Sequence, residues 1–329
     1  METYSNTPQE EPAREIMIEP TPAENPAPEL SGDPDPAPEP QSEEERMIEE
    51  QPAAEPLYNR AEADVIVRYL TEEGLFDPEY ILLFGSLAGG TPHSEAKSYD
   101  LLLVVGNLPV HDWMDAKRDL RYKLPYSRRK VTYVNLYVCS LSYVRSHRTP
   151  FLDFAHREGM LLYCKDTFYF RRPKRLCNFE AALCDARSYF ETFMPLADLA
   201  MKAAVAGSPA SPTELRWSAF MTAQAGVLYY KILYYVYHNR PFDGNDPLLL
   251  HERMRTLSTE LMLLFDSSHT RGNATLVALK RFGRTAFGEL RFEEHPLELK
   301  EHMERVVRLG EIVERCCRKR LELYGSLCE

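Results

Sequence analysis

Two short runs of consecutive apolar residues stand in the middle of the chain, YILLF at residues 80–84 and LLLVV at residues 101–105. Runs of this length without alternating polar residues are typical of strands that are covered on both faces of a sheet. A third segment, residues 131–139, is rich in β-branched and aromatic residues and predicts another strand. Residues 58–170 therefore predict a small mixed α/β sheet. Two helical patterns accompany these strands, at residues 61–73 and 111–122.

The strand signals stop near residue 171, and helical patterns follow. Stretches rich in Gly, Pro and Asp separate them, because these residues end helices. The segment 220–237 is apolar on most sides, so we expect it at the buried centre of a helical bundle that spans residues 171–329. The five predicted helices span residues 176–206, 213–238, 248–265, 273–292 and 297–323. The apolar stripe of the last one consists of Met303, Val306, Val307, Gly310, Val313 and Cys317.

The N-terminal segment, residues 1–57, has a different composition from the rest of the chain. It holds 16 acidic residues, two basic residues and 12 of the 24 prolines. Few of its residues are aromatic or β-branched, so little apolar surface is available to offset the entropy of ordering it, and we expect a disordered acidic arm. Residues 58–329 carry 34 acidic and 37 basic residues, a net charge of +3. This part of the chain is therefore compatible with a nucleotide or RNA partner.

Several classes of protein are disfavoured by the sequence. No stretch reaches the roughly 18 apolar residues of a membrane span, and the N-terminus lacks the basic and apolar regions of a secretory signal. The seven cysteines form no C-x-x-C pair, which suits reduced thiols, and the histidines form no Cys/His set for zinc. We therefore expect a cytoplasmic protein without a zinc site and without a membrane partner.

The stretch from residue 80 to residue 105 also carries the residues with chemical potential. The first apolar run ends at Gly85-Ser86, where a strand meets the predicted start of a helix. Glycine allows a phosphate to approach the backbone closely, and a serine hydroxyl with the amides of a helix start can hold phosphate oxygens. Asp100 opens the next strand, where a carboxylate would hold Mg²⁺ against a triphosphate.

On these residues the stretch resembles the minimal nucleotidyltransferases of the DNA polymerase β superfamily, whose pattern is Gly-Ser, an Asp-x-Asp strand and a third Asp on a later strand. The rest of the chain resembles the HEPN helical domain that is fused to such transferases in bacterial, Bacteroidetes-like proteins. The segments that carry this second likeness are residues 219–237, 286–292 and 305–316, and residues 150–163 resemble the join that follows the third strand in such fusions. The resemblance covers about residues 60–320 and implies Mg²⁺ as cofactor, ATP or another nucleoside triphosphate as ligand, and a homodimer formed through the helical bundle.

The chain departs from the transferase pattern at two of the three acid positions. Ser98 and Asp100 share one face of their strand and occupy the Asp-x-Asp positions, and Asn135 stands at the third. Serine and asparagine can coordinate a cation but supply no charge, whereas a two-metal site needs anionic oxygens. Glu95 could substitute only by swinging in from its loop. Alternatively, Asp100 pairs with a nearby basic side chain, and Asn135 forms hydrogen bonds with Ser98 or Asp100.

The helical part departs from the HEPN ribonuclease pattern as well. That pattern is an Arg followed by four to six residues and a His. Here only three residues separate Arg291 from His295, and Pro296 follows the histidine directly. The alternative is a surface arginine and a histidine that ends a helix. His251, near the predicted start of a helix, is a further candidate for the groove of the bundle or simply a first-turn residue.

Two hypotheses of different class follow. The resemblance implies an enzyme that uses Mg²⁺ and ATP to modify a protein or small molecule in a toxin–antitoxin or defence setting. The loss of two acids favours a catalytically impaired regulator that binds a nucleotide or RNA. An active HEPN ribonuclease and an aminoglycoside-type transferase are further alternatives. Three basic clusters around the expected join between the domains support the RNA partner. They are residues 128–130, Arg145/His147/Arg148 and residues 171–175.

Overall fold

The computed structural model describes residues 58–72, 76–91, 93, 95, 98–106, 133–172, 177–206, 211–265, 270–285 and 295–328. The predicted arm at residues 1–57 and the predicted helix at residues 111–122 lie outside these ranges. Within them, a small mixed sheet is followed by helices, as the sequence predicts.

The sheet has four strands in the order β3-β2-β1-β4. The strands are β1 (Pro78–Phe84), β2 (Ser98–Val105), β3 (Tyr133–Ser140) and β4 (Met160–Cys164). β1 pairs antiparallel with both β2 and β4, whereas β2 and β3 run parallel, with Asp100 opposite Asn135. The first three strands are those predicted from the apolar runs. The fourth was not predicted, although its segment MLLYC is also a run of five apolar residues; it lies at the edge of the sheet and is only partly buried.

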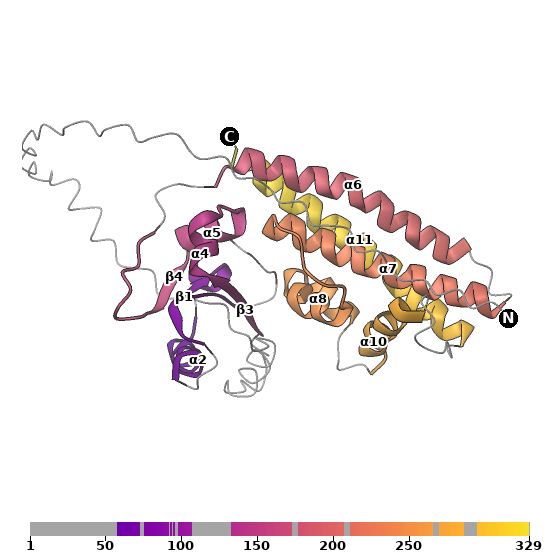
Figure 1. The fold of residues 1–329 in the computed structure, drawn as a ribbon, viewed down its shortest axis with the longest axis horizontal. Coiled ribbons are helices and arrows are strands. Elements are labelled where there is room, and N and C mark those ends of the chain that lie inside the picture. Colours follow the sequence, from indigo (N-terminus) through magenta and orange to yellow (C-terminus); the bar gives the residue numbers. More distant parts are fainter. Residues whose placement is uncertain are drawn as a thin grey trace, which may run out of the picture. The chain divides into compact units, whose positions relative to one another are not determined.

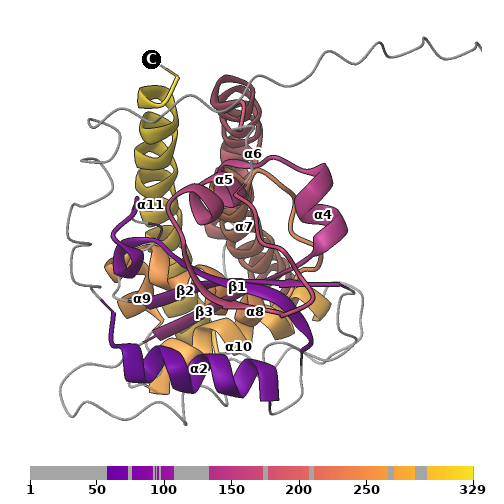
Figure 2. The ribbon, with the colours of Figure 1, turned by 90° about the vertical axis from the view of Figure 1, so that its left-hand side faces the viewer.

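Both faces of the sheet are covered (Figure 2), as the unbroken apolarity of β2 requires. The predicted amphipathic helix α2 (Arg60–Glu72) packs on one face through Ile66 and Leu70, in a core that includes Leu101 and Leu103. On the opposite face, the alternate residues Leu102 and Val104 form a second core with Phe151, Leu152 and Ala155. Two short helices follow β3 on that side and were not predicted, α4 (Leu141–Ser146) and α5 (Pro150–Arg157).

Three long helices lie side by side in the second half of the chain (Figure 1). They are α6 (Phe179–Ala206), α7 (Pro212–His238) and α11 (Pro296–Ser326). Most residues of α7 between Ser218 and His238 are buried, so the prediction of a central apolar helix is confirmed. On α11 the predicted stripe is buried at Val306, Gly310, Val313 and Cys317, but Val307 is 41% exposed and does not belong to it.

The segment predicted as one helix at residues 248–265 is broken. It forms α8 (Pro247–Met254), a 3-10 turn η2 (Arg255–Leu257) and α9 (Thr259–Leu264). The break occurs at Ser258, whose backbone is extended with φ −140° and ψ 137°. The next helix, α10, spans Thr270–Thr285.

The described sheet and helices belong to one compact unit, residues 55–329. The predicted division of this unit at residue 170 stays a prediction. None of the helices described in it is both long enough and apolar enough to cross a membrane.

Candidate functional site

The Gly85-Ser86 turn connects β1 to a helix of only three residues, the 3-10 helix η1 (Ser86–Ala88). The amides of Ala88 and Gly90 donate to the Gly85 carbonyl, and the amide of Gly89 donates to that of Ser86. The turn itself therefore uses the amides of Ala88, Gly89 and Gly90 for its own hydrogen bonds. So short a helix also lacks the aligned peptide dipoles that favour anions at the start of longer helices. Nucleotide binding at Gly85 and Ser86 stays a prediction.

Asp100 lies at the centre of a buried polar cluster that also contains Ser98, Asn135 and Thr256. Ser98 Oγ donates to Asp100 Oδ1 at 3.1 Å, and Asn135 Nδ2 donates to the same oxygen at 2.7 Å. Asn135 Nδ2 also lies 3.3 Å from Ser98 Oγ and 2.8 Å from Thr256 Oγ1 in η2. The expected hydrogen bonds of Asn135 with Ser98 and Asp100 are thus present, and the helical part of the chain adds a partner that the sequence did not indicate.

The second oxygen of Asp100 lies against Gly85. A Cβ atom built at Gly85 would lie only 2.9 Å from Asp100 Oδ2. Gly85 also has φ 76° and ψ −155°, a backbone conformation that is essentially restricted to glycine. The glycine therefore allows the close approach of a carboxylate from the neighbouring strand, in the place where the sequence suggested the approach of a phosphate.

The cluster does not fit a magnesium centre. Asp100 and Ser98 are fully buried, and Asn135 and Thr256 are 2% and 1% exposed. Mg²⁺ gives up its water ligands reluctantly and keeps several of them in most protein sites. One carboxylate in a fully buried cluster offers too little charge and no room for those waters. No group of three or more His, Cys, Asp or Glu suited to a metal occurs in the described parts of the chain. Glu95 does not compensate, because its carboxylate binds the Thr259 amide and Lys319.

Two buried histidines lie beside this cluster, among aromatic rings. His93 Nε2 lies 3.1 Å from Tyr137 Oη, and the ring of His238 packs 4.7 Å from that of Phe151 and 5.6 Å from that of His93. Burial, and next Arg320, lowers the pKa of His93 well below its usual value; burial, and next His93, does the same for the pKa of His238. Burial, and next the charge of Asp100, raises the pKa of Tyr137. The surroundings therefore hold both histidines neutral.

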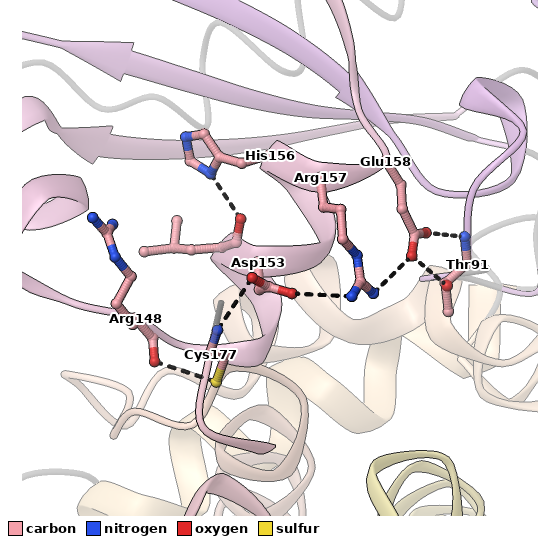
Figure 3. Close-up of polar contacts among 8 residues, drawn as sticks. Thr91, Arg148, Asp153, His156, Arg157, Glu158 and Cys177 are labelled. Atoms are coloured by element: carbon pink, nitrogen blue, oxygen red, sulfur yellow. Dashed lines mark hydrogen bonds and ion pairs between the residues drawn. The ribbon is translucent and has the colours of Figure 1, made fainter. Parts of the chain in front are cut away.

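The helix α5 ties the loop after η1 to the start of the helical part (Figure 3). Glu158 accepts hydrogen bonds from the amide of Thr91 and, at 3.0 Å, from its hydroxyl. Arg157 links Glu158 to Asp153, with distances of 3.1 Å and 3.8 Å. Asp153 Oδ1 accepts from the Cys177 amide at 3.2 Å, shortly before α6 begins. These contacts fix the position of the Thr91 loop relative to the segment that leads into α6.

The sheet also presents an arginine-rich pocket that brings together parts of two predicted basic clusters. Its volume is about 260 Å³. The four arginines of its lining are exposed; one lies on α4, one between α4 and α5, and two after β4. No acidic residue is among the lining residues. The lining consists of Arg145, Arg148, Arg171 and Arg172, the aromatic residues Tyr80, Phe168, Tyr169 and Phe170, and Leu141, Val144 and His156. Residues 128–130 and 173–175, which complete the predicted clusters, lie outside the described residues.

On the aromatic side of the arginine pocket, two hydrogen bonds of His156 fix the orientation of Tyr80. His156 Nδ1 lies 2.7 Å from the Leu152 carbonyl and must donate to it, which leaves Nε2 as the acceptor for the Tyr80 hydroxyl at 2.9 Å. Tyr169 is 75% exposed, and the guanidinium of Arg171 lies 4.9 Å from the centre of its ring. The pocket thus combines positive charge with accessible aromatic surface.

The predicted HEPN pair is only partly described, because Arg291 lies outside the described residues. His295 is exposed and caps α11, with its Nδ1 accepting from the Leu297 amide at 3.3 Å. His251 is buried in the bundle and lies 2.7 Å from the Tyr230 hydroxyl. Its position agrees with a packing role, and the ribonuclease assignment stays a prediction.

Thr256 and His93 could not be recognised from the sequence as parts of the site, because neither belongs to a motif. Arg320 was missed as well, although it carries a signal. It stands three residues after Cys317 and four before Tyr324, in line with buried residues of α11, where a charged residue is unexpected. Comparison with known proteins adds no family: no protein-family model matches the chain, and no curated protein matches it significantly.

Proposed function

We propose that the chain is a non-catalytic RNA-binding regulator, built from a nucleotidyltransferase-like sheet domain and a HEPN-like helical bundle. The mixed four-stranded sheet followed by helices is compatible with the resemblance that suggests these two parts. The observation that carries the proposal is the arginine-rich pocket beside α4 and β4. The toxin–antitoxin or defence setting is an extension of the same proposal, taken from the resemblance.

The absence of catalysis is supported by the state of Asp100. This carboxylate is fully buried and accepts hydrogen bonds from Ser98 and Asn135. A transferase would need it exposed to a hydrated metal ion and to the phosphates of its substrate. Here the amide of Asn135 and the hydroxyl of Thr256 occupy the space beside it. The only acid that remains of the transferase pattern therefore has a structural role.

RNA binding is supported by the chemistry of the pocket. Guanidinium groups form paired hydrogen bonds to phosphate, and exposed aromatic rings stack on unpaired bases. Four exposed arginines and the exposed ring of Tyr169 offer both kinds of contact within one pocket. A free nucleoside triphosphate gathers its negative charges on one compact group, whereas a single strand carries one negative charge at each successive nucleotide and so spreads them along its length. Four arginines on two walls therefore suit a strand better than a free nucleotide.

The test is the salt dependence of binding of a short single-stranded RNA, measured by fluorescence anisotropy on the full chain. If the four arginines each neutralise a phosphate, log K should fall with log[salt] with a slope of about −2.8. The variant Arg145→Gln/Arg171→Gln should reduce the magnitude of that slope to about 1.4. The affinity for a DNA strand of the same sequence, measured in parallel, shows whether the protein recognises the 2′-hydroxyl of the ribose.

The matched control is Arg308→Gln/Arg318→Gln on α11, which removes the same charge outside the pocket. Both arginines are exposed, with side-chain exposures of 52% and 63%. The control should retain the slope of the unaltered chain. Equal losses in the two double variants, or no RNA binding at all, would overturn the proposal.

The catalytic alternatives are tested in the same preparations. Calorimetric titration with ATP should show no Mg²⁺-dependent binding, because Asp100 is closed to a hydrated ion. RNA recovered after the anisotropy experiment should be intact on a gel. Binding of ATP that requires Mg²⁺ would favour the transferase hypothesis. RNA cleavage that is lost in His295→Ala would favour the ribonuclease hypothesis.

A further inference from the structure

Two of the four arginines of the arginine-rich pocket are held in place by the backbone of the chain. Arg148 Nη1 donates to the Val144 carbonyl at 2.8 Å, and Arg172 Nη2 donates to the Gly159 carbonyl at 3.2 Å. The backbone of Arg148 is held as well, because its carbonyl accepts from Cys177 Sγ at 3.4 Å (Figure 3). Each guanidinium group uses one nitrogen in this way, and in the described part of the chain no hydrogen bond engages its other two. We call Arg148 and Arg172 the fixed pair.

The other two arginines of the pocket have fewer constraints. Arg145 and Arg171 form no hydrogen bond with the described residues. The guanidinium of Arg171 lies 4.9 Å from the ring centre of Tyr169, a contact that permits movement across the face of the ring. Side chains of this kind can adapt to a ligand, whereas the fixed pair presents its donors at one place before a ligand arrives.

The size of the pocket suits about one nucleotide. Its volume of about 260 Å³ lies just below the usual range for sites of drug-sized ligands. Of its four Phe and Tyr residues, only Tyr169 is exposed; Phe168 and Phe170 are half-buried and Tyr80 is buried. Proteins that bind the middle of a single strand use grooves that follow the backbone and stack successive bases. A small pocket with one exposed ring suits the end of a strand better.

The charge of the pocket suits a terminal phosphate. Burial raises the pKa of the Tyr80 hydroxyl, and the charges of Arg145 and Arg148 oppose this rise, so both arginines lie close to the aromatic side of the pocket. His156 stays neutral there, because burial lowers its pKa. An internal phosphodiester carries one negative charge. A phosphate monoester carries about 1.5 to 2 at pH 7 and has three acceptor oxygens, which match the two forks of the fixed pair.

We propose, building on the RNA binding proposed above, that the arginine-rich pocket receives the phosphorylated end of the strand. The fixed pair, Arg148 and Arg172, binds the terminal phosphate monoester, and the last base stacks on Tyr169. Arg145 and Arg171 contact the phosphates that follow. A monoester at the 5′ end and one at the 3′ end offer the same chemistry, and the experiment separates them.

The test compares three forms of one short single-stranded RNA as competitors of a labelled strand, by fluorescence anisotropy on the full chain. The three forms carry a 5′-phosphate, a 3′-phosphate or hydroxyls at both ends. At least one phosphorylated form should compete about tenfold more strongly than the hydroxyl form, because the monoester adds a charge and an acceptor oxygen. The form that is preferred identifies the end that enters the pocket, and equal preference for both phosphorylated forms shows that either end can enter.

Three double variants localise the preference. Arg148→Gln/Arg172→Gln should abolish it, so that the three forms compete equally. Arg145→Gln/Arg171→Gln, the matched control, removes the same charge from the same pocket and should weaken all three forms while the tenfold ratio remains. Arg148→Lys/Arg172→Lys keeps both charges but lacks the guanidinium forks, and should reduce the ratio to about threefold. The lysine variant keeps the test valid if the glutamine variant does not fold.

Equal competition by the three forms would overturn the recognition of the strand end. It would leave the proposed RNA binding intact, provided that the salt dependence still requires Arg145 and Arg171. A tenfold ratio that persists in Arg148→Gln/Arg172→Gln, or that disappears in Arg145→Gln/Arg171→Gln as well, would also overturn it. No binding of any form would overturn both proposals.

Discussion

The side-chain nitrogen of Asn135 lies 2.7 Å from Asp100 Oδ1 and 2.8 Å from Thr256 Oγ1, so one amide joins two strands of the sheet to the helical part of the chain. Asn135 and Thr256 are 121 positions apart in the sequence. Because the cluster is buried, each of its polar atoms depends on the others for hydrogen bonds. The cluster therefore connects the sheet to the helical part through buried hydrogen bonds.

Asn135→Asp tests whether the cluster is closed to metal. The new carboxylate would lie against Asp100 in a buried site, so we expect the free energy of unfolding to fall by about 3 kcal/mol. Added Mg²⁺ should not restore it, because the cluster has no room for the ion and its waters. Urea unfolding in EDTA and in Mg²⁺ measures both effects. Recovery of the original stability in Mg²⁺ alone would contradict the structural role of Asp100.

Gly85→Ala should destabilise the chain more than Gly89→Ala. Both glycines have positive φ, 76° and 77°, but a Cβ at Gly85 meets Asp100 Oδ2, whereas one at Gly89 meets nothing within 4 Å. We expect a loss of about 3 kcal/mol for Gly85→Ala and about 1 kcal/mol for Gly89→Ala. Chemical unfolding of the two variants side by side measures the difference. Equal losses would mean that Asp100 does not occupy the space beside Gly85.

Acidification should destabilise the chain through its buried histidines. The pKa values of His93 and His238 are lowered in the folded chain, so the unfolded chain binds more protons below pH 6.5. The stability that the two neutral histidines contribute is complete above that pH and is lost as the pH falls below it. Each fully buried histidine contributes a slope of up to about 1.4 kcal/mol per pH unit. Urea unfolding at a series of pH values measures the slope.

His238→Phe should remove one histidine from that slope. Both ring nitrogens of His238 lack a hydrogen-bond partner among the described residues, and aromatic rings surround it, so at neutral pH we expect a change in stability of less than about 1 kcal/mol. An unchanged slope in this variant would show that His238 takes up a proton in the folded chain. A large loss of stability at neutral pH would show that the imidazole has a partner.

Glu158→Gln should loosen the loop that contains Thr91. The carboxylate accepts from the Thr91 amide and hydroxyl and pairs with Arg157 at 3.1 Å. Loss of its charge weakens these contacts by about 1.4 kcal/mol, which corresponds to roughly tenfold faster hydrogen exchange at the Thr91 amide. Exchange measured by mass spectrometry on peptides covering residues 85–95 tests this. Glu191→Gln, on the exposed side of α6, is the control and should leave these peptides unchanged.

The sequence predicted elements well where one local property determined them. The runs at residues 80–84 and 101–105 became β1 and β2 because continuous apolarity has few other uses at that length. It failed where tertiary contacts decided the outcome. β4 does contain an apolar run, MLLYC, but it pairs only with β1 at the edge of the sheet, and its sequence was not assigned to a strand. The extended backbone of Ser258, which divides the predicted helix at residues 248–265, follows neither a proline nor a glycine.

The candidate site was predictable only in part, for the same reason. The two-residue spacing of Ser98 and Asp100 places them on one face, and the structure agrees. The basic residues Arg145 and Arg171 were recognised as belonging to clusters, but their convergence on one pocket depends on the course of the chain through β4. The partnership of Asn135 with Thr256 links distant segments, and no local pattern encodes it.

The span between Asn135 and Thr256 also sets an order of events during synthesis. At roughly 5–20 residues per second, Thr256 leaves the ribosome about 6 to 24 s after Asn135. The strands that carry Ser98, Asp100 and Asn135 are thus complete while the residue that closes their cluster has not yet been translated. During that interval the polar centre of the sheet is open to water. The final burial of Asp100 must therefore await the second half of the polypeptide.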